Sequence, residues 1–262
     1  MTYRWYAEMA DFIDRAPEEA AFIFNDYAAF DYIKWRQLDR QVFRNDVALR
    51  RTFGGDGIVI PAEGGAPLYY AHHPDAPPAA ALRARFLDGP VYESAARDSR
   101  GLPVLTVYAV DTAAASQQAG ALDPVYAPDR ATQLSAPVDF GGTLALLGVA
   151  FQPATDDEIA LLSYWRVTAR PPFVSTFVHA VGPDGALVAQ HDGLAPAEFE
   201  LTPGDLIVQR HTLPLPANRA DDARYDLFLG VYTEGDVARL PVAGGPADAV
   251  WLGAWAAGGV QR

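Results

Sequence analysis

Hydrophobic positions in the first part of the chain switch between the spacing of helices and the short runs of strands. Trp5, Met9, Phe12 and Ile13 recur at i, i+4, i+7 and i+8, which is one face of a helix. Two more segments have helical spacing, 27–35 and 79–87. Short apolar runs of strand length occur at 20–24, 58–61, 67–71 and 103–110. Helices that alternate with short strands predict a small α/β domain over residues 1–111.

The stretch 112–130 breaks this pattern, and we expect it to be a linker. It is rich in Ala, Ser, Gln, Gly and Pro, and its hydrophobic positions have no period. After it, short apolar runs separated by turn residues replace the helical spacing. These runs predict strands at 143–151, 158–168, 174–181, 186–191, 205–213, 225–232, 239–242 and 250–255. The pattern is typical of a jelly-roll-like antiparallel β-sandwich over residues 131–262, which makes the whole chain α+β.

The sequence STFVHAVGPDGALVAQHDG at 175–193 predicts a β-hairpin. Its central Gly-Pro-Asp-Gly suits a type I turn closed by a left-handed glycine. If Gly182 lies opposite Ala186, Phe177 lies opposite His191. The hairpin face that this register predicts is mostly apolar and turned toward a core, and it comprises Phe177, His179, Val181, Leu187 and His191. A one-residue slip would break this grouping.

Composition narrows the classes of partner and chemistry. The 262 residues are 50% hydrophobic, enough to form a substantial core, and the net charge is −13. This acidic balance argues against nucleic acid or an anionic membrane surface as the main partner. Because the chain has no cysteine, it has no disulfide, zinc-thiolate site or cysteine nucleophile. No apolar run approaches the roughly 20 residues that span a bilayer, and no signal peptide is visible.

Six sequence blocks carry a resemblance to a known family. They are LALLGVAF (144–151), LLSYWRV (161–167), TFVHAVGPDGALVAQHDG (176–193), LTPGDLIVQRHTLPLP (201–216), YDLFLGVYT (225–233) and ARLPV (238–242). In this order they resemble the C-terminal soluble β-sandwich of bacterial membrane glycosyltransferases of the protein-mannosyltransferase type. The opening helix and PVLTVYAV (103–110) are similar to the small α/β segment that follows the last membrane helix in such proteins. The loop NRADDAR (218–224) departs from the family's short Pro/Gly approach to the YDLFLGVYT strand.

The resemblance implies a non-catalytic accessory region on the extracytoplasmic face of the cell membrane. In that family, acidic residues of the membrane region transfer the sugar from a lipid-linked donor. This chain has no counterpart of those loops, so no catalytic residue and no cofactor carry over. The expected partner is a glycan or an acceptor protein. Contact with a membrane is expected only through a region upstream of Met1.

The histidines near the hairpin are the first group of candidate site residues. His179, His191, Asp192 and His211 bring together the imidazole and carboxylate ligands that divalent metals use. No tight motif such as H-E-x-x-H accompanies them, so the favoured interpretation is histidines of a sheet with backbone partners. The sequence leaves the presence of a metal open.

Aromatic residues of the second half form the other candidate group. A stacking platform for the apolar face of a sugar ring could use Tyr164, Trp165, Tyr232, Trp251 and Trp255. Strand alternation sends Tyr164 and Trp165 to opposite faces, so at most one of them is expected in the core. The alternative is that these residues form the sandwich core with a scattered surface aromatic. We therefore take Trp165, Tyr232, His179, His191 and Asp192 as the candidate ligand-binding residues.

Weaker candidates lie elsewhere in the chain. The acidic turn at 156–158 could supply oxygen ligands to calcium, although a solvated loop is the favoured interpretation. Asn25 and Asp26 end a predicted strand, at the edge where α/β sheets bind ligands, but Asp26 equally suits a helix N-cap. Two other functions stay open beside the accessory role: a free-standing glycan-active hydrolase that uses paired carboxylates, and a purely structural or protein-docking module.

Overall fold

The computed structural model describes residues 2–26, 47–62, 67–118, 121–153, 157–220, 223–243, 245–256 and 259–261. The chain is mostly β, and antiparallel pairing predominates, which is consistent with the predicted β-sandwich. It divides into two compact units. Unit 1 comprises Met1–Ser116 and Ala195–Glu200, and unit 2 comprises Gln117–Leu194 and Leu201–Arg262.

Unit 1 contains a mixed sheet with the strand order β2-β1-β4-β6-β5. Strand β1 (Ala21–Asp26) pairs in parallel with β2 (Ala48–Phe53) and β4 (Leu68–His72). Strand β6 (Thr106–Val110) is antiparallel to β4 and to β5 (Leu87–Glu93). The remaining elements are β3 (Gly57–Ile60), α3 (Ala80–Phe86) and the 3₁₀ turn η1 (Glu198–Glu200), while α4 (Thr112–Gln118) begins in unit 1 and ends in unit 2.

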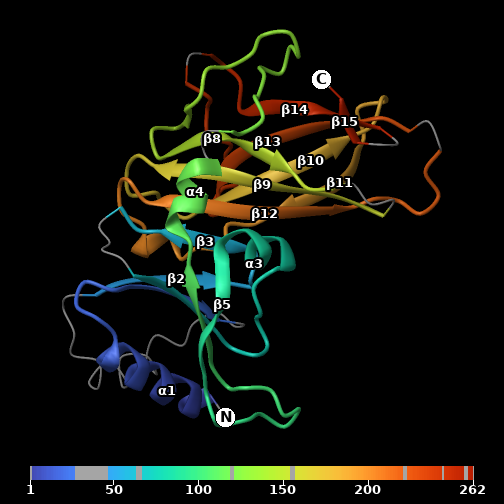
Figure 1. The fold of residues 1–262 in the computed structure, drawn as a ribbon. Helices are drawn as coiled ribbons and strands as arrows, with labels where there is room; N and C mark the ends of the chain where they lie inside the picture. The colour runs from blue at the N-terminus through green and yellow to red at the C-terminus, as the bar shows by residue number, and fades with distance from the viewer. Residues whose placement is uncertain are drawn as a thin grey trace. The chain divides into compact units, whose positions relative to one another are not determined.

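Helix α1 (Thr2–Arg15) confirms the first helix predicted from the sequence, and it packs on the sheet of unit 1 (Figure 1). Trp5, Met9 and Ile13 are buried against Phe22 and Phe24 of β1. Burial of each such side chain contributes about 1.5–3 kcal/mol. The helical spacing of hydrophobic residues therefore corresponds to a real core-facing stripe.

A short segment from the second half of the chain completes unit 1. The Phe53 amide donates to the Ala195 carbonyl and the Ala197 amide to the Arg51 carbonyl, both at 2.9 Å. Arg51 also forms an ion pair with Glu200. The spacing of strands in the sequence gave no signal that residues 195–200 return to the first unit.

Unit 2 is built from two antiparallel sheets, drawn as two layers in Figure 1. One sheet has the order β11-β10-β13-β14-β15, and its strands are β10 (Val174–Val181), β11 (Leu187–Asp192), β13 (Tyr225–Thr233), β14 (Ala249–Ala256) and β15 (Gly259–Gln261). Among the strands of unit 2, the other sheet runs β12-β9-β8-β7, with β7 (Val138–Phe140), β8 (Leu144–Phe151), β9 (Glu158–Val167) and β12 (Leu206–Pro214). Fully buried residues of both sheets, such as Trp165, Val178 and Leu227, form the core.

Residues of the expected linker cover the outer face of the second sheet. The Asp123 amide donates to the Val149 carbonyl at 2.8 Å, and the Tyr164 hydroxyl of β9 donates to the Gln118 side chain at 2.9 Å. Tyr164 and Trp165 are consequently both fully buried. The expectation that at most one of them lies in the core was wrong, because this segment covers the face that alternation would have left exposed.

Most of the other predicted helices and strands are present in the described residues. Strands at 20–24, 58–61, 67–71 and 103–110 correspond to β1, β3, β4 and β6, and the helix at 79–87 to α3. Strands β2, β5, β7 and β15 were not predicted. Residues 239–242 form bridges from Arg239 to Tyr232 and from Val242 to Phe140 in place of a strand. The helical pattern at 27–35 lies outside the described residues.

Candidate functional site

A β-bulge in the β10–β11 hairpin decides which side chains meet. The turn forms as predicted: the Gly182 amide donates to the Ala186 carbonyl at 2.8 Å, and Gly185 is left-handed with φ of 81°. The register then shifts by one residue between Ala180 and Val181. As a result, Phe177 lies opposite Asp192, and His191 lies opposite Val178.

The predicted pairing of Phe177 with His191 was therefore wrong, and so was the shared face of His179 and His191. An extra residue on one strand moves every later side chain to the other face of the sheet. Phe177, His179 and Asp192 now share one face, while His191 projects from the other. The Phe177 face is also not core-facing along its length, since Leu187 is 50% exposed.

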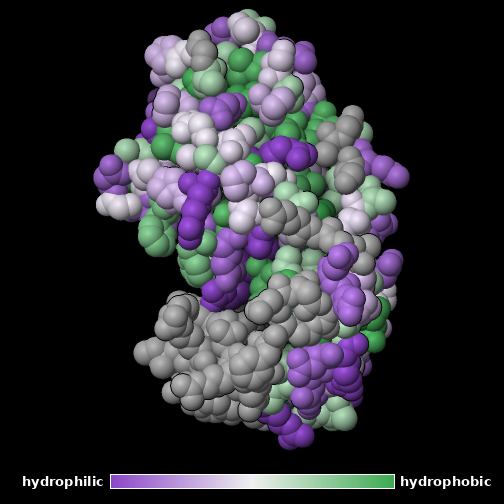
Figure 2. All heavy atoms as spheres, turned by 90° about the vertical axis from the view of Figure 1, so that its left-hand side faces the viewer, coloured by the Kyte–Doolittle hydropathy of each residue, from purple (hydrophilic) through white to green (hydrophobic). Residues whose placement is uncertain are grey.

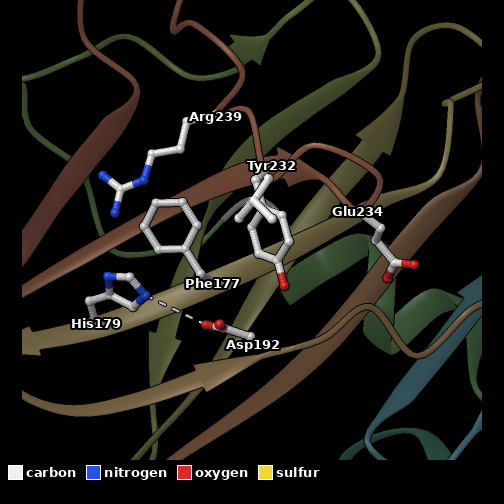
Figure 3. Close-up of a pocket in the computed structure, with 7 residues that line it drawn as sticks. Phe177, His179, Asp192, Tyr232, Glu234 and Arg239 are labelled. Carbon is white, nitrogen blue, oxygen red and sulfur yellow. Dashed lines mark ion pairs between the residues drawn. The ribbon is translucent and has the colours of Figure 1, made fainter.

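This face of the hairpin forms part of a surface pocket of about 410 Å³ in unit 2. Strands β10 and β11 contribute Phe177, His179 and Asp192, and the end of β13 contributes Tyr232. The lining is completed by three residues that follow Tyr232 in the chain: Glu234, Val237 and Arg239. In Figure 3, His179 faces Asp192, Arg239 lies beside Phe177, and Glu234 lies on the far side of Tyr232.

Phe177 lies at the base of the pocket and forms its apolar floor, although its ring is almost fully buried beneath the Arg239 guanidinium. The Arg239 guanidinium carbon lies 4.6 Å from the centre of its ring, and the ring centres of His179 and Tyr232 lie at 4.5 and 6.3 Å (Figure 3). Gly230 lies opposite Phe177 on β13, where an added Cβ would stand 2.4 Å from Phe177 Cζ. The absence of a side chain at Gly230 leaves room for the Phe177 ring.

His179 and Asp192 form the polar contact inside the pocket. His179 Nε2 lies 3.5 Å from Asp192 Oδ1, and the Gln190 amide donates weakly to Asp192 Oδ2 at 3.4 Å. Burial lowers the pKa of His179, and the Arg239 charge lowers it further, while Asp192 opposes both effects. His179 is therefore neutral at neutral pH, with its Nε2 facing the Asp192 carboxylate.

Two polar groups of the pocket are free to meet a ligand. Within the described part of the chain, neither the Tyr232 hydroxyl nor the Glu234 carboxylate has a hydrogen-bond partner in the protein. Arg239 is only loosely held, with its Nη1 3.6 Å from Asp248 Oδ1. A hydroxyl donor, a carboxylate acceptor and a guanidinium thus line one apolar floor.

His191 belongs to a different, buried arrangement. Its Nδ1 lies 3.1 Å from Nδ1 of His211, and His211 Nε2 lies 2.8 Å from the Ser163 hydroxyl. The Trp165 indole donates to the same hydroxyl at 2.8 Å. Burial lowers the pKa of His211 well below its usual value, with a further contribution from His191, so His211 is neutral at neutral pH.

Of the candidate aromatic residues, Tyr232 is the one that lines the pocket of Phe177, while Trp255 lines a separate pocket of about 230 Å³ with Phe151 and Ile159. Trp165 is fully buried, with its ring centre 5.5 Å from that of Phe140, so it presents no surface to a ligand. Trp251 packs against Tyr126, and Trp255 stacks on Tyr225. These tryptophans contribute to the core.

The remaining candidates do not form a metal site. Among the described residues, no three His, Asp or Glu side chains are grouped so that they could hold a metal ion. Asp156 lies outside the described residues. Asn25 is buried, and its amide group links three neighbours: it donates to the Ala76 carbonyl at 2.7 Å and accepts from the Gly55 amide and the Thr52 hydroxyl. Asn25 therefore fixes loops rather than facing a ligand.

Sequence reasoning found His179, Asp192 and Tyr232 but missed the three lining residues that follow Tyr232 in the chain. Glu234, Val237 and Arg239 follow β13 in a turn, and no motif marks them. The ARLPV block, which contains Arg239, was the one available signal. The Arg239–Tyr232 bridge shows that this block folds back onto the end of β13.

Comparisons with known proteins yield one structural similarity. No family model and no curated protein matches the chain. Among solved structures, it is similar to one described as the crystal structure of the C-terminal domain of Wzt, with 14% identity and a TM-score of 0.33. That similarity covers 44% of this chain and 75% of the Wzt chain, and no functional conclusion rests on it.

Two further observations concern membranes and the surface. None of the helices in the described ranges is long and apolar enough to cross a membrane. On the face drawn in Figure 2, hydrophilic and hydrophobic residues are mixed outside the grey region. Such mixing is usual for a protein surface in contact with water.

Proposed function

We propose that unit 2 is a non-catalytic glycan-binding module, and that the pocket floored by Phe177 is its binding site. The observation that carries the proposal is the combination of Tyr232, Glu234 and Arg239 around this floor. The half-buried Tyr232 ring offers a surface for the apolar C–H face of a sugar, while carboxylate and guanidinium groups hydrogen-bond its hydroxyls. The pocket volume of about 410 Å³ lies within the usual range for small-molecule sites.

The accessory role beside a membrane glycosyltransferase forms part of the same proposal. Its support is the resemblance of the six sequence blocks, three of which supply the pocket: 176–193 carries Phe177, His179 and Asp192, 225–233 carries Tyr232, and 238–242 carries Arg239. In this proposal the module has a jelly-roll-like sandwich, unit 1 is the small α/β domain, and both lie on the extracytoplasmic face of the membrane. The sandwich would hold a glycan or a glycosylated acceptor for a catalytic region elsewhere.

The test is calorimetric titration of the chain with neutral oligosaccharides, comparing the wild type with variants of Tyr232. Tyr232→Ala removes the ring and the hydroxyl, and we expect it to weaken binding at least about tenfold. We take the stacking of a sugar on Tyr232 to be comparable to the stacking of a nucleobase on an aromatic ring, which contributes about 1–3 kcal/mol. Tyr232→Phe keeps the ring and should weaken binding less. Leu187→Ala is the matched control, because Leu187 is exposed on the same hairpin but does not line the pocket. Equal affinities for wild type and Tyr232→Ala would contradict the assignment of the site.

A second candidate function deserves the same assay because Asp192 and Glu234 line one pocket. Paired carboxylates are the catalytic groups of glycoside hydrolases. If the chain were such a hydrolase, prolonged incubation with oligosaccharides would release new reducing ends, and Asp192→Asn or Glu234→Gln would abolish the release. Binding without turnover supports the accessory module, whereas turnover that these variants remove would replace it.

A further inference from the structure

Val237 combines three features that rarely occur together. It lines the pocket, its side chain is 67% exposed, and its backbone is left-handed with φ of 56°. Within the described ranges, the other non-glycine residues with positive φ are Glu19 and Arg130, neither of which is β-branched. A β-branched residue in this conformation is a true outlier, because its Cβ substituents crowd the backbone.

The surrounding turn holds Val237 in this conformation. The Asp236 carboxylate accepts from the Ala238 amide at 3.1 Å and from the Thr233 hydroxyl. The Thr233 amide donates to the Ala238 carbonyl at 2.9 Å, and the Glu234 amide to the Phe173 carbonyl at 2.9 Å. These bonds close the turn on both sides of Val237, so the strained residue is fixed by its neighbours and not by burial of its own side chain.

An exposed valine in a strained backbone conformation does not stabilise the fold of unit 2. Glycine or asparagine would relieve the backbone at this position, and a polar side chain would suit its exposure. Backbone strain that persists beside a pocket points to a role in binding. Val237 is also the one aliphatic side chain among the residues that line the pocket, which include the carboxylates of Asp192 and Glu234.

We infer that Val237 is a specificity-determining residue whose isopropyl group contacts an apolar substituent of a neutral glycan; this inference rests on the proposed function. The two carboxylates of Asp192 and Glu234 outnumber the single Arg239 guanidinium among the lining residues, and this negative balance disfavours sugars that carry their own negative charge. The remaining class is neutral sugars with a methyl group, which a 6-deoxyhexose carries on its ring and an N-acetylhexosamine carries on its acetamide. Contact with one buried methyl group corresponds to about fourfold in affinity.

The test measures affinity and thermal stability for the same set of variants. The ligands are four trisaccharides that end in a plain hexose, a 6-deoxyhexose, an N-acetylhexosamine or a hexuronic acid. We expect the wild type to bind one of the two methyl-bearing sugars about fourfold more tightly than the plain hexose, and to bind the hexuronic acid most weakly. Whichever of these two sugars binds more tightly shows whether Val237 contacts a ring methyl group or an acetamide methyl group.

Val237→Gly should abolish this methyl preference while the melting temperature rises by about 2 °C, because relief of the backbone strain is larger than the entropic cost of the added freedom of the unfolded chain. Val237→Thr keeps the β-branch and the strain, so it should lower the preference without raising the melting temperature. Glu19→Gly is the matched control, since it relieves a left-handed residue of unit 1 and should leave the preference unchanged.

The outcomes separate the inference from the proposed function. If the wild type binds all neutral sugars equally, or if Val237→Gly keeps the methyl preference, the inference is overturned and glycan binding stands. A fall in the melting temperature of Val237→Gly also overturns it, because the valine would then serve the fold. If no trisaccharide binds, the proposed function and the inference fall together.

Discussion

Gly230 lies directly opposite Phe177 on the neighbouring strand, and the space left by its missing side chain is occupied by the Phe177 ring. A Cβ at Gly230 would stand 2.4 Å from Phe177 Cζ and 2.8 Å from the Asp248 carbonyl oxygen. The floor of the pocket therefore depends on a glycine that does not line it.

The first prediction follows from this contact. Gly230→Ala should lower the free energy of unfolding of unit 2 by about 1–3 kcal/mol, since inserted atoms force packed neighbours apart. It should also weaken glycan binding, because the Phe177 ring must move. Urea unfolding and calorimetry measure the two effects. Gly235→Ala is the control, since an added Cβ there meets nothing within 4 Å; equal stability of the two variants would refute the packing argument.

The second prediction concerns the buried hydroxyl of Ser163, which joins Trp165 to His211. Ser163→Ala leaves the Trp165 indole N–H and His211 Nε2 without this partner, so we expect a loss of about 1–3 kcal/mol in the free energy of unfolding. Thr212→Val is the counterpart, because the Thr212 hydroxyl is buried without a hydrogen-bond partner among the described residues. Its removal should be neutral or stabilising. If Thr212→Val lowered the free energy of unfolding more than Ser163→Ala, the hydrogen bonds of Ser163 would not be what stabilises this part of the core.

The third prediction concerns pH. Because the pKa of His211 is lower in the folded protein than its ordinary value of 6.5, the unfolded chain binds the extra proton. The stability that a neutral His211 provides is complete above pH 6.5 and is lost as the pH falls below it, by at most about 1.4 kcal/mol per pH unit.

Urea unfolding at pH 7.5 and 5.5 measures this loss, and His211→Gln supplies the control. The variant keeps the similar contributions of His72 and His179, whose pKa values are also lowered by burial. Its free energy of unfolding should therefore depend less on pH than that of the wild type. The same pH dependence in both proteins would exclude His211 as the cause.

The fourth prediction concerns unit 1. Asn25→Ala removes the amide that bonds to Ala76, Gly55 and Thr52, so the free energy of unfolding should fall by about 2–4 kcal/mol. Asn218→Ala is the matched control, because Asn218 is exposed and its replacement should change stability by less than about 0.5 kcal/mol. An equally small effect of Asn25→Ala would mean that other contacts hold the two loops.

The sequence predicted strands and turns well where local chemistry determines them. The hairpin turn at 182–185 follows from its proline and glycine residues, and α1 from the period of Trp5, Met9 and Ile13. The pairing of His179 and His191 failed because a bulge leaves no clear mark in an apolar strand. One extra residue was enough to send His179 to the pocket and His191 to the buried contact with His211.

The sequence also did not predict that a segment distant along the chain covers one face of a sheet. Strand alternation describes a sheet with one open face, but the segment that contains Gln118 and Asp123 closes that face over Tyr164. The same limit hid the pocket. Glu234, Val237 and Arg239 become neighbours of Phe177 only because the chain reverses after β13, and polar residues in a turn look alike whether or not they face a ligand.

The central claim is that the pocket around Phe177 binds a neutral glycan, and its most direct test is a titration followed by amide NMR of the whole chain. With an added neutral oligosaccharide, we predict saturable shifts that cluster at Phe177, His179, Asp192, Tyr232, Glu234, Val237 and Arg239. Tyr232→Ala should remove these shifts and leave the rest of the spectrum unchanged. Saturable shifts that lie away from these residues, or no shifts at any concentration, would contradict the claim.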